Sequence, residues 1–293
     1  MLLRKALFSW IAFPFYVWQG IALRLKIERL HPPDIAPEGD FEGEGEEIRL
    51  LVAGDSSVAG VGMASLEETL TYNLATIVNE RTGRPLYWRA AGANSATAGD
   101  LRDHVIPNLD RRDYTDVVLV VGTNDMKNFH AVRRFKKEFG SLVYAVRTRF
   151  PHARIYWAPV ADMTLIPALP KTLGKILKAR ADLINEMGAR LCRERGLTIV
   201  EPVPILGPEG FARDGFHAGP AGYRSWAGHL ADYLYPQRAG SGLTRSSQLE
   251  GADDEDNDQP GQRELPEIAA LAHAGQADRL DDLDHHRKYD ENR

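Results

Sequence analysis

The chain has 293 residues, with 36 Lys+Arg against 41 Asp+Glu and a formal net charge of -5. Its single cysteine, Cys192, excludes an intramolecular disulfide framework and any cysteine-based zinc or iron–sulfur site. The charge is uneven, because residues 241–293 carry 14 acidic and 6 basic side chains whereas the preceding residues carry 27 acidic and 30 basic. No dense basic stripe is present to neutralise phosphates, so the composition does not indicate a partner among nucleic acids.

An uncharged run rich in aliphatic and aromatic residues occupies positions 6–23, close to the N-terminus. A transmembrane helix needs about 20 apolar residues, and the run is not followed by the small residues of a signal-peptide cleavage site. We therefore expect residues 1–30 to form an uncleaved membrane anchor that either spans the bilayer or lies in its interface, which makes the protein membrane-associated. The alternative is an apolar helix that packs on the protein's own domain. Basic residues flank both ends of the run, so they do not indicate which side of the membrane holds the rest of the chain.

Residues 31–46 contain three prolines and three glycines, a composition typical of a linker. Beyond them, short apolar runs alternate with segments of helical spacing, a pattern that predicts a parallel sheet covered on both faces. We expect five strands, at residues 48–53, 86–90, 116–121, 154–160 and 197–200. We expect helices at residues 65–82, 99–109, 132–150, 171–195 and 220–235.

These elements define one domain over residues 47–238. The remaining segment, residues 239–293, is polar, acidic and poor in large apolar side chains, so we expect it to be a disordered tail. The sequence therefore predicts an anchor, a linker, one α/β domain and a tail, and it does not indicate an oligomeric state.

Small polar blocks follow three of the expected strands. They are Gly-Asp-Ser-Ser at 54–57, Gly-Ala-Asn-Ser-Ala-Thr at 92–97 and Gly-Thr-Asn-Asp at 122–125, and a fourth block, Asp-Gly-Phe-His at 214–217, precedes the last helix. In open α/β sheets ligands bind beyond the carboxyl ends of the strands, so these blocks are expected to meet at one edge. Each block alone is equally typical of a turn or a helix cap. Their order and placement together indicate a catalytic site.

The combination resembles the SGNH hydrolase family, also called the GDSL esterase/lipase family, over about residues 47–236. The resemblance implies a flavodoxin-like three-layer α/β/α sandwich and an ester hydrolase without a metal or organic cofactor. Ser57 stands where many members have leucine. Ser95 stands where the family glycine of the second block would fall, unless Gly92 takes that role.

Acyl transfer gives each of these residues a chemical role. A serine hydroxyl needs a base to remove its proton during attack, and His217 is the candidate base for Ser56. Asp214 lies three residues earlier and can hold the other imidazole N–H. The family resemblance implies three oxyanion donors: the backbone N–H of Ser56, a backbone N–H near Ser95, and the side-chain amide of Asn124.

The substrate is indicated only in outline. Residues 163–170 follow the fourth strand and carry several apolar side chains, which would line an acyl pocket, form a lid near the bilayer, or simply pack against the domain. Together with the anchor, they favour small-molecule or lipid acyl esters. The same site would serve an O-acyltransferase or a carbohydrate O-acetylesterase. A catalytically silent binding scaffold is the alternative from a different functional class.

Overall fold

The computed structural model describes residues 7, 10–26, 28–204 and 206–237. The chain divides into two units, Met1–Ser241 and Gly242–Arg293, and the whole second unit lies outside the described residues. The expected disordered tail at 239–293 and the first residues of the expected anchor also lie outside them.

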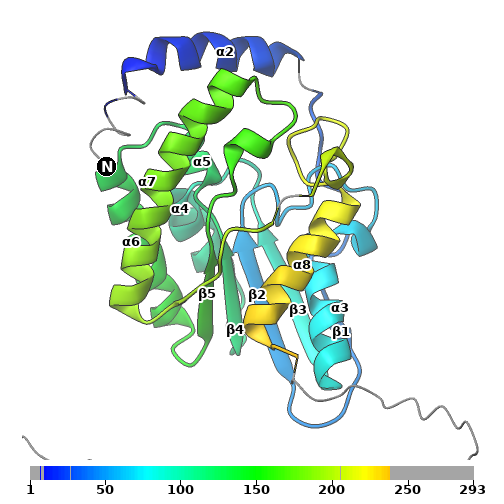
Figure 1. Cartoon of the computed structure of the whole chain (residues 1–293). Helices are drawn as coiled ribbons and strands as arrows, with labels where there is room; N and C mark the ends of the chain where they lie inside the picture. The colour runs from blue at the N-terminus through cyan, green and yellow to red at the C-terminus, as the bar shows by residue number, and fades with distance from the viewer. Residues whose placement is uncertain (1–6, 8–9, 27, 205, 238–293) are drawn as a thin grey trace, which may run out of the picture. The chain divides into compact units, whose positions relative to one another are not determined.

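The centre of the domain is a six-stranded sheet with the order β1-β3-β2-β4-β5-β6 (Figure 1). All five expected strands are present and pair in parallel, which confirms the predicted sheet. They are β2 (Ile48–Gly54), β3 (Leu86–Gly92), β4 (Asp116–Val120), β5 (Arg154–Ala158) and β6 (Thr198–Ile199).

The sixth strand, β1 (Glu38–Phe41), lies inside the segment whose composition indicates a linker. It pairs antiparallel with β3 at the edge of the sheet, and the Trp88 ring of β3 lies against Gly39, only 3.0 Å from where a Cβ would be. The sequence does not reveal this strand because it is four residues long and none of its residues is buried. Short edge strands lack the alternating apolar signature of core strands.

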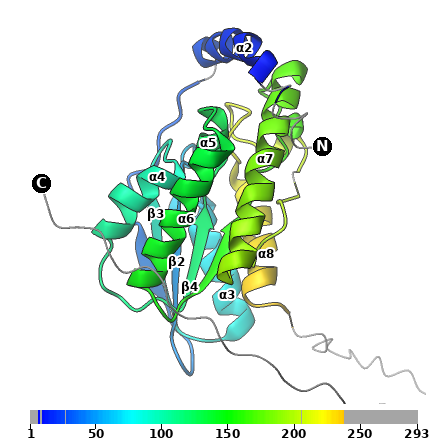
Figure 2. The same cartoon turned by 90° about the vertical axis from the view of Figure 1, so that its left-hand side faces the viewer.

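Helices cover both faces of the sheet, which confirms the three-layer α/β/α fold (Figures 1 and 2). Strand residues Leu50 and Val52 point toward a core formed with α3 (Leu70–Thr82) and α8 (Pro220–Leu234). Their neighbours in β2 point to the opposite core, formed with α6 (Val132–Arg149) and α7 (Lys171–Arg195). This alternation follows from the two-residue period of a strand whose two faces are both buried.

The expected helix at 99–109 is broken into three short pieces. These are α4 (Ala98–Asp100), a π-helical turn at Leu101–Val105 and a 3₁₀ turn at Ile106–Asn108. Pro107 in the last piece has no N–H to continue an α-helical ladder. Three further 3₁₀ turns (Leu66–Glu68, Met163–Leu165 and Pro208–Gly210) and the five-residue helix α5 (Thr123–Lys127) complete the loops.

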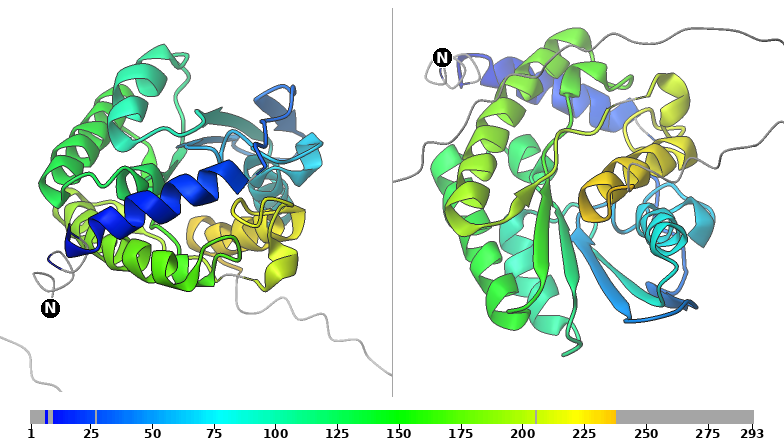
Figure 3. Two further views of the ribbon diagram at one scale, coloured as in Figure 1. Left: turned by 90° about the horizontal axis from the view of Figure 1, so that it is seen from above. Right: turned by 60° about the horizontal axis from the view of Figure 1, so that its bottom comes forward.

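Helix α2 (Phe13–Lys26) belongs to the expected anchor. It crosses the end of the domain where the carboxyl ends of the parallel strands lie, as the view from above shows (Figure 3). Among the residues described above, no helix combines the length and the apolarity needed to cross a bilayer.

Candidate active site

The turn after β2 presents Ser56 at the edge of the sheet. The backbone N–H of Asp55 donates to the Val120 carbonyl over 3.2 Å, and the Asp55 carboxylate accepts the Ser57 N–H over 3.0 Å. Asp55 is buried, and burial raises the pKa of its carboxyl above the usual value although the hydrogen bond from Ser57 acts in the opposite direction. The buried carboxyl group of Asp55 therefore stabilises the turn by a hydrogen bond, while Ser56 lines a cavity.

Two glycines allow the strand ends to approach this turn. A Cβ on Gly92 would lie 2.1 Å from the Ala59 nitrogen, so only glycine lets the end of β3 pack against the Ser56 turn. Gly122 precedes α5 with φ +129°, a backbone conformation that favours glycine, and a Cβ there would lie 3.0 Å from Val160. Both positions hold their strand ends near Ser56.

Ser56, His217 and Asp214, which we call the serine trio, are joined by hydrogen bonds. His217 Nε2 lies 3.2 Å from Ser56 Oγ, and His217 Nδ1 lies 2.6 Å from Asp214 Oδ2. The other carboxylate oxygen of Asp214 accepts the backbone N–H groups of Phe216 over 2.9 Å and His217 over 3.0 Å. Burial alone would raise the pKa of Asp214, but these hydrogen bonds and the nearby imidazole outweigh burial and hold its pKa below the usual value. Asp214 is thus kept as a carboxylate that orients the imidazole.

The acid and the base lie in one tight loop. Phe211 and Ala218 form an isolated antiparallel bridge at its ends, and the Ala212 N–H donates to the His217 carbonyl over 2.8 Å. Gly215, with φ +64°, makes the turn between Asp214 and His217. The relative position of the Asp214 and His217 side chains is therefore set within a few residues of chain.

The expected oxyanion side chain, Asn124, is buried in α5. Its Nδ2 donates to the Ala96 carbonyl over 3.0 Å and lies 3.5 Å from Asp55 Oδ2, which ties it to the turns that carry Ser95 and Ser56. Ser95 adopts φ +64°, a conformation that explains why glycine suits this position.

Two hollows meet at these residues. A small pocket of about 110 Å³ is lined by Ser56, Asn124 and His217, and by apolar side chains that include those of Met163 and Ile166. A larger groove of about 670 Å³ is lined by Asn124, His217, Asp214 and Ser95, and its opposite wall is α2. Gly92 lines neither hollow, whereas Ser95 faces the groove.

The segment 163–170 contributes to both hollows, because Leu169 lines the groove. The structure thus places part of this segment at the site, as one of its expected roles requires. Lys127 also lines both hollows, with its ammonium nitrogen 5.3 Å from the centre of the Phe216 ring. Lys127 belongs to none of the motif blocks, although it lies three residues beyond Asn124 in the same short helix.

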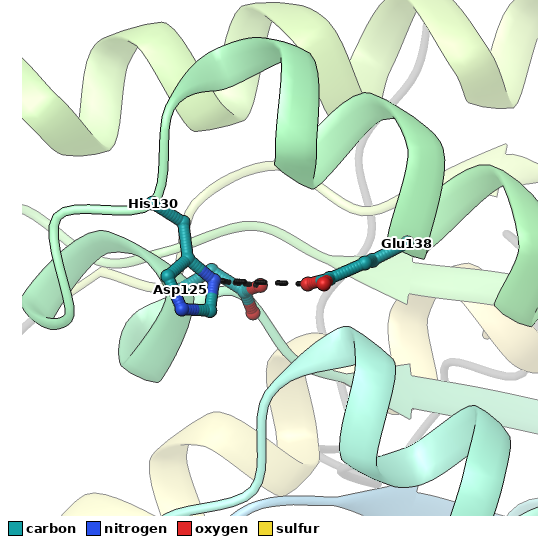
Figure 4. Close-up of side chains that lie close together, drawn as sticks. All are labelled: Asp125, His130 and Glu138. Atoms are coloured by element: carbon teal, nitrogen blue, oxygen red, sulfur yellow. Dashed lines mark hydrogen bonds and ion pairs between the residues drawn. The ribbon is translucent and has the colours of Figure 1, made fainter.

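A second cluster of titratable groups consists of Asp125, His130 and Glu138 (Figure 4), and Asp125 directly follows Asn124 in the chain. Ligand-type atoms of the three residues lie within 4.8 Å of one another, and such residue types also bind divalent cations. Here His130 Nδ1 lies 3.2 Å from Asp125 Oδ1 and 3.7 Å from Glu138 Oε2.

The other Asp125 oxygen accepts the Ala98 N–H over 3.0 Å, and burial raises the pKa of this carboxyl despite that bond. The cluster therefore links α5 to α6 and to the start of α4. It holds the turn that carries Asn124, and its side chains do not line either hollow.

Comparison with known proteins places this geometry in a family. A sequence model of the GDSL-like lipase/acylhydrolase family matches residues 52–225. No curated relative matches the sequence.

Similar solved structures include TesA, with a TM-score of 0.53 and 17% identity over 64% of this chain and 99% of TesA. LAE5, an α/β hydrolase from the metagenome of Lake Arreo, has a TM-score of 0.50 and 16% identity over 68% of this chain and 99% of its own. The family 3 carbohydrate esterase of Clostridium thermocellum has a TM-score of 0.51 and 13% identity over 64% of this chain and 94% of its own. At these identities the structural likeness establishes the shared fold. Because the family match extends over more than half of the sequence, the chain belongs to the GDSL-like lipase/acylhydrolase family of hydrolases.

Proposed function

We propose that the protein is a serine hydrolase that cleaves carboxylic acyl esters through an acyl-enzyme on Ser56. The observation that carries this proposal is the chain of hydrogen bonds from Ser56 Oγ through His217 to Asp214 at the wall of an apolar pocket. A serine in this setting is activated when the imidazole accepts its proton during attack on a carbonyl carbon.

In the first half of the reaction, Ser56 Oγ bonds to the ester carbonyl carbon while its proton passes to His217 Nε2. The carbonyl oxygen then carries the negative charge, and the candidate donors are the Ser56 N–H, the Ser95 N–H and Asn124 Nδ2. When the tetrahedral intermediate collapses, the bond to the alcohol oxygen breaks and His217 returns the proton to the leaving alcohol. Asp214 stabilises the imidazolium between these two transfers.

In the second half, His217 removes a proton from water, which attacks the acyl-enzyme carbonyl. The carboxylic acid is released, and Ser56 recovers its proton from His217. Each bond is made and broken by the trio and water, so these steps require no further reactant.

The labelling of Ser56 by a fluorophosphonate probe tests this proposal. The wild-type protein should be labelled, Ser56→Ala should not, and His217→Ala should be labelled far more slowly because its serine lacks a base. Ser65→Ala, which removes a hydroxyl outside both hollows, is the matched control and should retain labelling. A folded wild-type protein that is not labelled would refute the proposal and favour a silent scaffold.

The small pocket favours one second candidate, the removal of acetyl groups from carbohydrates. Its volume of about 110 Å³ suits a short acyl group, and the wider groove would then hold the sugar. Rates for p-nitrophenyl esters of increasing acyl length, measured beside acetylated sugars, separate the two candidates. Faster turnover of acetylated sugars than of long-chain esters would favour the second.

A further inference from the structure

One face of helix α2 contacts the domain through aromatic rings, together with Trp10, which precedes the helix. The rings of Phe13 and Tyr16 lie 4.9 and 4.3 Å from the ring of Phe129, measured between centroids, and Trp10 lies 6.0 Å from it. The Tyr16 hydroxyl also donates to the backbone carbonyl of Lys127. The helix therefore rests on the loop between α5, which carries Asn124, and α6.

The opposite face of the same segment is apolar and exposed to solvent. Of the eleven exposed large apolar side chains among the described residues, eight lie between positions 7 and 25. Five of these eight lie outside the groove and outside the ring contacts to Phe129, namely Leu7, Ile11, Phe15, Trp18 and Leu25. The most exposed of them include Leu25 at 83%, Ile11 at 72% and Trp18 at 65%. An exposed apolar surface of this kind marks an interaction site, because water would otherwise have to hydrate it.

Charge indicates what this surface binds. The first 30 residues contain five basic side chains and a single acidic one, Glu28, whose carboxylate is paired with Arg213 over 3.1 Å. Tryptophan and basic residues beside an apolar helix face are typical of segments that lie in an anionic membrane interface. A second copy of the chain would bring the same basic segment against itself, which like charges disfavour.

The length and position of α2 also favour the interface over a span. Its 14 residues make a helix of about 21 Å, shorter than the ~30 Å hydrocarbon core of a bilayer. The helix crosses the catalytic end of the domain (Figure 3) and forms the outer wall of the groove through Tyr16, Val17, Gly20, Ile21 and Leu23. A membrane bound to its outer face would thus lie next to the entrance of the site.

We infer that α2 seats the protein on an anionic phospholipid bilayer, and that the groove beneath α2 leads the hydrocarbon chain of an acyl ester from that bilayer to Ser56. The second part rests on the proposed function, whereas the first part stands without it. The groove is also lined by Leu173 and Leu177 of α7 and by Leu169, which precedes α7. These apolar side chains suit a hydrocarbon chain.

Docking is tested by sedimentation with vesicles of phosphatidylcholine, with or without an equimolar amount of phosphatidylglycerol. The full chain is used in the Ser56→Ala background, so that binding is measured without turnover. Trp18→Glu should lower the partition coefficient on the anionic vesicles by at least about tenfold, because a carboxylate replaces an inserted ring. Tyr144→Glu is the matched control, since Tyr144 is 69% exposed on α6, outside the groove and outside α2, and it should bind as the parent does.

Three outcomes overturn the docking inference. They are equal binding by both glutamate variants, equal binding of the parent to both kinds of vesicle, and a parent dimer that Trp18→Glu dissociates without any vesicle binding. Because Ser56 is absent from these proteins, failure here is distinct from failure of the probe labelling.

The groove is tested by filling it from α2. Gly20 lines the groove, and a Cβ built there meets no described atom within 4 Å, so the backbone leaves room for the Cβ of Gly20→Leu. Gly228 of α8 is equally open and lies outside both hollows, so Gly228→Leu makes the same change in a helix away from the site. The ratio of kcat/KM for p-nitrophenyl laurate to that for p-nitrophenyl acetate should fall about tenfold in Gly20→Leu relative to Gly228→Leu, since the loss of space for a few methylenes costs about 0.8 kcal/mol each. An unchanged ratio would refute the groove assignment while leaving the probe labelling intact.

Discussion

His217 and Asp214 of the serine trio border the same groove as α2, yet different forces hold the trio and the helix. The trio is fixed by hydrogen bonds of 2.6 to 3.2 Å, most of them within the loop that carries Asp214 and His217. Helix α2 is held by apolar packing that includes aromatic contacts to Phe129, and by the hydrogen bond from Tyr16. Directional polar contacts specify a geometry closely, whereas ring contacts allow sliding and release. Substitutions in the trio should therefore change the rate of ester cleavage, whereas substitutions at the contacts of α2 should change how substrates reach the groove.

The largest effect is expected in the trio. Asp214→Asn should lower kcat by about 10⁴-fold, because an amide cannot stabilise the imidazolium and favours the wrong tautomer. Steady-state kinetics with a soluble ester measure the loss. Asp232→Asn, which removes an exposed carboxylate from α8, is the control. A loss below tenfold would show that Asp214 does not orient the base.

Asn124→Ala should lower kcat by about 10²–10³-fold with a smaller change in KM, because the lost donor acts on charge that develops in the transition state. Asn108→Ala removes an exposed amide whose Nδ2 donates to the His104 carbonyl, and it serves as the matched change away from the site. A rise in KM at constant kcat would instead assign Asn124 to ground-state binding.

Phe129→Ala should release α2 while leaving the core intact. Aromatic pairs contribute about 0.5–1.5 kcal/mol each, so loss of three of them should speed amide hydrogen exchange in α2 by at least about tenfold. Amides of β4 should exchange as before. Tyr16→Phe, which keeps the ring and loses one hydrogen bond, should give a smaller acceleration. Faster exchange throughout the sheet would show that α2 and the core are one cooperative unit.

The lowered pKa of Asp214 should affect how thermal stability falls with decreasing pH. Because its pKa is lower in the folded protein than in the unfolded chain, this carboxylate stabilises the fold above the unfolded pKa of about 3.9, and the contribution disappears as the pH falls through the lower folded pKa. Asp214→Asn should therefore lose less thermal stability than the wild type between about pH 5 and pH 3. If the melting temperatures of the two proteins fall by the same amount across this pH range, the lowered pKa of Asp214 is contradicted. Asp55, whose pKa is raised, contributes a slope of opposite sign in both proteins, so the difference between them isolates Asp214.

The smallest effect concerns Ser95. Its φ of +64° is strained for a residue with a Cβ, so Ser95→Gly should change the free energy of unfolding by no more than about 1 kcal/mol, in the stabilising direction. Ser95→Ala keeps the Cβ and the strain and should match the wild type. If the glycine variant is no more stable than the alanine variant, strain at this position is negligible.

The sequence predicts the core of the fold well because its strongest signals are local. Helix α7 begins and ends where its pattern indicates, at Lys171 and Arg195, since Gly196 closes it with φ +64°. Strand β4 is a continuous apolar run and is found as expected. Strand β1 is missed because its backbone pairing with β3 depends on a neighbour far along the chain and leaves no pattern in its four residues.

The motif blocks likewise predict that Ser56, Asn124 and His217 meet, and the structure places all three at one pocket. Their catalytic roles remain predictions. The cluster of His130 with Asp125 and Glu138 escapes the sequence because only the turn between α5 and α6 brings these side chains together. The apolar N-terminal run indicates a membrane segment, but nothing in its pattern shows which face packs on the domain.

The compact loop that carries both Asp214 and His217 has a mechanical consequence. Because Phe211 and Ala218 close the loop, we expect Asp214 and His217 to move together when the sheet fluctuates. The separation between His217 Nε2 and Ser56 Oγ, 3.2 Å in this structure, then becomes the one adjustable coordinate of the trio. Thermal motion that preserves the loop would then change the rate of proton transfer mainly through the distance between His217 Nε2 and Ser56 Oγ. A graft of residues 211–218 onto a related sheet would transfer Asp214 and His217 together.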